Sequence, residues 1–187
     1  MKPHSQDVVE GFQHRYISAI NNALHHMLAD STSIGGHNNE EVRSLLRYHL
    51  GWEEANGNPT KKNQGKSLRS VLCLLACEIN QGNWEAAIPA AVSLELIHNF
   101  SLIHDDVQDK DTTRRGRSTV WSIWGIPKAI AAGNAMRVLA DQSLSKLSSH
   151  GLDPELTLKA VSMLTKRYTE MIEGQFENEK QEASIMD

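Results

Sequence analysis

Residues 94–120, LELIHNFSLIHDDVQDKDTTRRGRSTV, carry an apolar helical stretch that ends in a cluster of carboxylates and continues into a basic loop. At about 100° per residue, His98, Asp105 and Asp109 project from one face of the predicted helix, within roughly 40° of one another. Asp106 lies about a quarter turn away. Two carboxylates one turn apart repel each other unless a cation lies between them, so this face is expected to hold a metal ion.

The residues around this face indicate which metal and which ligand it would take. Oxygen donors with no cysteine nearby favour Mg²⁺, or Mn²⁺, over zinc. Arg114, Arg115 and Arg117 follow, spaced by Gly116, and arginines can hold phosphate oxygens in pairs. A carboxylate cluster followed by a basic loop suits a magnesium-bridged diphosphate, whose several negative charges need cations from both metal and protein.

A second informative segment is GKSLRSVLCLLACEI, residues 65–79, where Gly65, Lys66 and Arg69 stand at the start of a strongly apolar helix. Free backbone N–H groups and the helix dipole favour an anion at such an end. Lysine and arginine three residues apart can share that anion. The segment therefore predicts a second anion site.

The segment HNFSLIHDDVQDKDTTRRGRST, residues 98–119, resembles the first aspartate-rich motif, DDxxD, of the trans-isoprenyl diphosphate synthases, with the Arg-Arg-Gly that follows it in that family. The resemblance implies that Asp105 and Asp109 are the primary metal ligands, assisted by Asp106. It also implies that Arg114 holds the allylic diphosphate. These four residues form the expected catalytic set.

Further residues match the family's substrate site. Lys66 and Arg69 match the basic positions of its GKxxRP motif, although Ser67 and Ser70 depart from the pattern. By resemblance these two residues bind isopentenyl diphosphate together with His98 and Arg115. In EMIEGQFENE, residues 170–179, Gln175 matches a Gly-Gln motif that lines the active site, whereas Asn178 stands where the family commonly has aspartate.

The implied activity is that of a trans-prenyltransferase, which condenses an allylic diphosphate with isopentenyl diphosphate and needs no side-chain nucleophile. Phe100 and Ser101 lie one turn below Asp105, where the family sets product length by side-chain bulk. A single aromatic residue there favours geranylgeranyl diphosphate, with farnesyl diphosphate as the nearer alternative.

Three other functions remain open. A terpene cyclase of the same fold would ionise a diphosphate but would not need an isopentenyl site. A non-catalytic partner subunit of a heteromeric prenyl synthase is a second alternative, to which the CLLAC sequence lends weight. A metal phosphohydrolase that uses His104 and Asp105 as its metal pair is the third, but it leaves Asp109 and the arginine loop without a role.

Composition narrows the class of protein further. The chain has 187 residues and a net charge of −4, which argues against a general nucleic-acid binder. Its N-terminus lacks a hydrophobic signal core, and its longest apolar stretch is interrupted by Pro89, Ser93 and Glu95, so no membrane span is expected. Cys73 and Cys77 suit packed thiols in a reducing compartment. A cytoplasmic protein is expected.

Helical periodicity predicts helices over 6–29, 40–50, 65–79, 84–109, 127–148 and 153–180, a loop over 31–39 and a turn-rich linker over 51–65. No alternation typical of strands persists, so the fold is expected to be an all-α, isoprenoid synthase-type bundle. Gly133-Asn134 is expected to pack helices together.

The resemblance covers roughly residues 40–182, and the sequence holds one aspartate-rich motif where family members have two. Residues 1–187 are therefore expected to form a single helical domain that is the N-terminal portion of a longer synthase domain, with the C-terminal part missing. Such a chain should be a poor catalyst alone. A homodimer, or a heteromer with a related subunit, is expected.

Overall fold

The computed structural model describes residues 5–29, 40–60 and 65–186, and the architecture in these ranges is helical, as the sequence predicts. The helices are α1 (Ser5–Ala29), α2 (Glu40–His49), α3 (Leu68–Ile79), α4 (Ile88–Gln108), α5 (Val120–Trp124), α6 (Ile126–Ser145) and α7 (Pro154–Met186), with a 3₁₀ turn over Ser148–His150. The loop predicted at 31–39 falls outside the described residues.

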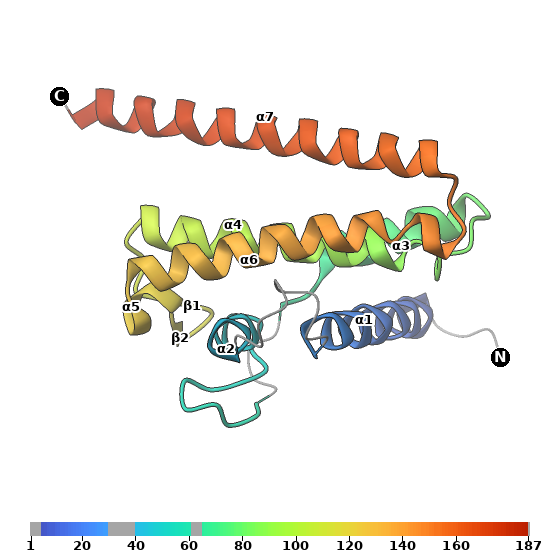
Figure 1. Cartoon of the computed structure of the whole chain (residues 1–187), viewed down its shortest axis with the longest axis horizontal. Coiled ribbons are helices and arrows are strands. Elements are labelled where there is room, and N and C mark those ends of the chain that lie inside the picture. The colour runs from blue at the N-terminus through green and yellow to red at the C-terminus, as the bar shows by residue number, and fades with distance from the viewer. Residues whose placement is uncertain (1–4, 30–39, 61–64, 187) are drawn as a thin grey trace.

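Helices α4 and α6 form the centre of the bundle and run antiparallel, side by side (Figure 1). In that view α1 and α2 lie on one side of this pair and α7 on the other. Helix α4 begins later than the predicted residue 84, because residues 84–87 form turns and Pro89 occupies the first helical turn. Proline is tolerated there because the N–H that it lacks would have no helical acceptor.

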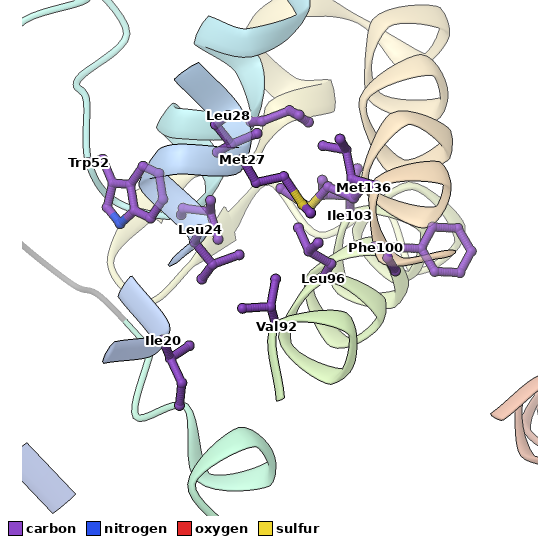
Figure 2. Packing of buried hydrophobic residues seen from close by; sticks show 14 of the residues in the cluster. Ile20, Leu24, Met27, Leu28, Trp52, Val92, Leu96, Phe100, Ile103 and Met136 are labelled. Atoms are coloured by element: carbon purple, nitrogen blue, oxygen red, sulfur yellow. The ribbon is translucent and has the colours of Figure 1, made fainter. Parts of the chain in front are cut away.

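The core lies between these central helices and α1. Leu96 and Ile103 of α4 and Met136 of α6 are at most 1% exposed and face Leu24 of α1 (Figure 2). Burying a side chain of this size stabilises the fold by about 1.5–3 kcal/mol. The positions on α4 recur at the three- and four-residue spacing that predicted the helix.

Small residues let α4 and α6 approach each other closely. Gly133 is buried, and a Cβ added there would lie 2.3 Å from Nε2 of His104 on α4. The expected helix-packing role of Gly133 therefore agrees with its position. His104 in turn packs edge-on against the ring of Phe100, at a centroid distance of 4.6 Å.

The arginine loop is more ordered than the sequence predicts. Strands β1 (Thr113–Arg114) and β2 (Arg117–Ser118) form a two-residue antiparallel hairpin, with Thr113 opposite Ser118. The linker after α2 also folds back on itself through a bridge between Glu53 and Pro59. These short pairings leave the all-α fold class unchanged.

Helix α7 runs along the α4–α6 pair (Figure 1). Many of its apolar side chains are exposed. Leu158, Met163 and Phe176 are each more than 60% exposed. Within the described ranges, none of the helices is both long and apolar enough to cross a lipid bilayer.

Candidate functional site

The carboxylates at the end of α4 point in different directions. Asp105 is half-buried and accepts a hydrogen bond of 2.6 Å from Nε2 of Gln175 on α7. Asp109 is the exposed residue that closes the helix, and its backbone N–H donates to the carbonyl of Asp105. The structure thus brings the predicted residues Asp105 and Gln175 together, 70 positions apart in the sequence.

Asp106 faces the hairpin instead. Its side chain is 2% exposed and pairs with Arg114, whose Nε lies 2.5 Å from Asp106 Oδ1. Burial raises the pKa of Asp106, and the Arg114 guanidinium opposes that rise. Among the residues that the structure describes, no three acidic, histidine or cysteine side chains gather as a metal-binding group. Asp106 therefore pairs with Arg114, whereas Asp105 and Asp109 stand one helical turn apart at the end of α4.

A basic cavity of about 530 Å³ opens at the first turn of α3. It is lined by Gly65, Lys66, Ser67, Leu68, Arg69, Glu95, His98 and Arg115. Four of these residues were predicted from the sequence to bind one substrate, and they come from three separate parts of the chain. Helix α3 has no side-chain cap at its N-terminus, so its first N–H groups add to the positive potential of the cavity.

His98 lies within this group of cations. Nη1 of Arg69 is 3.4 Å from Nε2 of His98. Burial lowers the pKa of His98, and the charge of Arg69 lowers it further. The imidazole is therefore neutral at neutral pH and leaves the positive charge of the cavity to Lys66, Arg69 and Arg115.

A second, largely apolar cavity of about 230 Å³ begins at Asp105. It is lined by Phe100, Ser101, His104, Asp105, Val107, Gln108, Ile130, Tyr168, Met171, Ile172 and Gln175. Both residues that were predicted to set product length are among them. Tyr168 of α7, which the sequence reasoning missed, packs on Phe100 at a ring distance of 5.6 Å. The apolar spacing of α7 was the available signal for it.

A small cavity beneath the hairpin holds further residues that the sequence reasoning did not single out. Tyr48 and His49 of α2 line it together with Asp106, Arg114 and Arg117. Burial, followed by the charges of Arg115 and Arg114, lowers the pKa of His49 to about 3. This histidine therefore adds no charge to a region that already holds three arginines.

The fold and the site together define a class of protein, an all-α bundle whose central helix ends in aspartates between a basic cavity and an apolar one. The chain belongs to the polyprenyl synthetase family, whose sequence profile matches residues 53–185.

Two relatives from Mycobacterium tuberculosis illustrate the similarity. The chain is 43% identical over 134 residues to a (2E,6E)-farnesyl diphosphate synthase, and this alignment covers 72% of this chain and 36% of the relative. It is 37% identical over 139 residues to a geranylgeranyl diphosphate synthase, and this alignment covers 74% of this chain and 39% of the relative. The chain therefore spans less than half the length of these relatives.

A solved structure agrees. The polyprenyl synthetase from Streptomyces coelicolor A3(2) superposes with a TM-score of 0.77 and 34% sequence identity, over 89% of this chain and 46% of that one. The helical arrangement described above is thus that of the family, and the match again covers under half of the longer chain.

Proposed function

We propose that this chain contributes the substrate-binding part of a trans-prenyltransferase that condenses an allylic diphosphate with isopentenyl diphosphate. The observation that carries the proposal is the convergence of Lys66, Arg69, His98 and Arg115 on one cavity, separate from the cavity that Asp105 lines. Two anion sites suit two diphosphate substrates. The basic cavity takes the isopentenyl one, and the Asp105 side takes the allylic one.

Asp105 and Asp109 are suited to bind a magnesium ion. Asp105 and Asp109 supply hard oxygen donors one helical turn apart, and Mg²⁺ ordinarily takes one or two carboxylates together with substrate phosphates and water. Mn²⁺ accepts similar donors. When bound, such an ion offsets the negative charge of the leaving diphosphate. Asp106 assists indirectly, because its carboxylate holds the guanidinium of Arg114 at the end of α4.

The chain's own part in the reaction is electrostatic and positional. The carbon–oxygen bond of the allylic diphosphate breaks, and its electron pair leaves with the diphosphate. The double bond of isopentenyl diphosphate then attacks the allylic cation and forms the new carbon–carbon bond. The cation that results gives up a proton to the released diphosphate. Arg114 holds the departing diphosphate, Lys66, Arg69 and Arg115 hold the other one, and the apolar cavity excludes water from the cation.

We propose a short-chain product, with geranylgeranyl diphosphate favoured and farnesyl diphosphate the alternative. Ser101 leaves room in the apolar cavity below Asp105, while Phe100 and Tyr168 restrict it further along α4. The two M. tuberculosis relatives are named for these two products. The basic cavity weighs against a terpene cyclase, which needs no isopentenyl site.

We also propose that residues 1–187 are part of a longer helical domain, in a homodimer or in a heteromer with a related subunit. The exposed apolar side chains of α7 support an additional packing partner, because large apolar patches usually mark contact surfaces. In this view the chain by itself binds substrates better than it turns them over.

Calorimetric titration of two variants tests the proposed function. Arg69→Ala should weaken binding of isopentenyl diphosphate at least tenfold, since it removes a charged donor from the basic cavity. Asp105→Asn should leave that affinity unchanged but weaken binding of geranyl diphosphate in the presence of Mg²⁺. Each variant thus serves as the control for the other. If the wild-type chain binds neither diphosphate, or both variants behave like it, the proposal is wrong.

A further inference from the structure

The hairpin turn that carries the arginines has an unusual backbone. Arg115 and Gly116 form its two-residue loop, with φ angles of 53° and 73°. Positive φ at both loop positions defines the type I′ turn, which normally takes Asn-Gly or Gly-Gly. Arginine is costly there, because a left-handed conformation brings its Cβ close to the following carbonyl, at about 1–2 kcal/mol. Other contacts must stabilise this turn.

The strained turn sends two arginines to different sites. Arg114, on β1, reaches Asp106 at the end of α4. Arg115, one residue later, lies against Gly65 and lines the basic cavity. The turn therefore determines which cavity each arginine serves.

Arg117 ties the hairpin to α2 and the linker that follows it. Its Nη1 donates to the Tyr48 carbonyl at 2.8 Å, and its Nη2 donates to the Glu53 carbonyl at 2.5 Å. Its guanidinium carbon also lies 4.2 Å from the centroid of the Tyr48 ring. The Tyr48 hydroxyl donates in return to the Ser118 carbonyl at 2.6 Å. Arg117 and Tyr48 therefore hold the hairpin against α2.

Arg117 does not belong to the basic cavity, and its side chain is only 14% exposed. Two of its nitrogens donate hydrogen bonds to main-chain carbonyls. Substitution of the side chains at those positions would leave these acceptors in place. Only a planar guanidinium can bridge two acceptors and stack on a ring at the same time. Its place in the structure is that of a support for the turn.

We propose that Arg117 is a positioning residue that holds Arg115 in the strained turn, and so sets the affinity of the basic cavity for isopentenyl diphosphate without touching that substrate. This inference rests on the proposed function of the cavity. Arg117 is the third arginine of the loop, and it lies outside the Arg-Arg-Gly motif that the family resemblance explains.

A double-mutant cycle measures this dependence. Arg117→Lys keeps the charge but cannot bridge both carbonyls, so it should weaken binding of isopentenyl diphosphate about tenfold by calorimetry. Arg115→Ala should weaken binding at least as much. Adding Arg117→Lys to Arg115→Ala should cost little more, because the residue that Arg117 positions is already absent. Additive losses, or wild-type affinity in Arg117→Lys, would overturn the inference.

Hydrogen exchange provides a readout that does not depend on substrate. Arg117→Lys should speed exchange of the Thr119 amide, which bonds to the Thr112 carbonyl across the hairpin, by at least tenfold. Tyr48→Phe removes the bond to Ser118 and should produce a smaller increase in the same amide. Arg167→Lys on α7, where the side chain is 71% exposed, is the matched control and should change nothing.

The two proposals fail in different ways. If the wild-type chain binds no isopentenyl diphosphate, the proposed function fails, and hydrogen exchange alone decides whether Arg117 holds the turn. If instead the wild type binds isopentenyl diphosphate while Arg117→Lys shows the same affinity and the same Thr119 exchange rate, the positioning role fails and the proposed function stands.

Discussion

Gly65 leaves the space that the Arg115 guanidinium occupies. A Cβ at position 65 would lie 2.9 Å from Nη1 of Arg115 and 3.2 Å from its Nη2. Because the obstructing atoms are the end of a flexible side chain, the arginine can move and the fold is not strained. The sequence motif identifies this glycine by its place before Lys66, but only the structure shows that it makes room for a residue fifty positions later.

Gly65→Ala should therefore weaken binding of isopentenyl diphosphate about tenfold while leaving the melting temperature near that of the wild type. The physical reason is displacement of Arg115 from the basic cavity. Calorimetry and thermal unfolding measure the two effects. Gly174→Ala on α7 is the control, since nothing lies within 4 Å of its added Cβ. Unchanged affinity in Gly65→Ala would contradict the proposed contact between Arg115 and the substrate.

The helix α4 shows how one element serves two cavities. His98 lines the basic cavity, and Ser101 and Asp105, nearer the C-terminal end of the helix, line the apolar one. Phe100 and Asp105 are five residues apart, or about 7.5 Å along the helix axis. A prenyl tail that enters at Asp105 therefore passes Ser101 before it reaches the Phe100 ring.

Ser101→Phe should narrow this passage and weaken binding of geranyl diphosphate about tenfold, while the shorter dimethylallyl diphosphate binds as before. Phe100→Ala should do the opposite and favour longer tails over shorter ones. Titration of each variant with both diphosphates, at constant Mg²⁺, gives the ratio of affinities. If neither ratio moves, the tail does not follow this cavity and the product assignment is wrong.

The boundaries of α1 and α2 were predictable from sequence to within one residue, whereas α4 begins four residues later than predicted and α7 ends six residues later. The hairpin was not, because two-residue strands are too short to show alternation. The quarter-turn offset of Asp106 was visible in the sequence, but its partner Arg114 was not, since the intervening turn depends on left-handed residues. Tyr48 and Arg117 meet across 69 positions, and no local pattern predicts such a contact.

At the scale of the whole molecule, the partly buried His49 beneath the hairpin links stability to pH. His49 has a pKa of about 3 in the folded chain, whereas an unfolded histidine titrates near 6.5. Between these values the unfolded state binds a proton that the folded state does not. The free energy of unfolding therefore falls as the pH is lowered, at up to about 1.4 kcal/mol per pH unit.

Urea unfolding at pH 7 and pH 5 should show a loss of about 2 kcal/mol from His49 alone. The lowered pKa of His98 acts in the same direction. His49→Gln should flatten this dependence, whereas His14→Gln, at an exposed position of α1, should leave it as in the wild type. An equal slope in wild type and His49→Gln would show that the pKa of His49 is the same in the folded and unfolded chain.

The way Arg117 grips the linker has a practical consequence for protein engineering. Its two hydrogen bonds end on the carbonyls of Tyr48 and Glu53, and carbonyls are supplied by every amino acid. The exposed tip at residues 55–58 adds no side chain to this grip. Fluorophore labels or affinity tags can therefore be built into that tip without altering the side chains that hold Arg117.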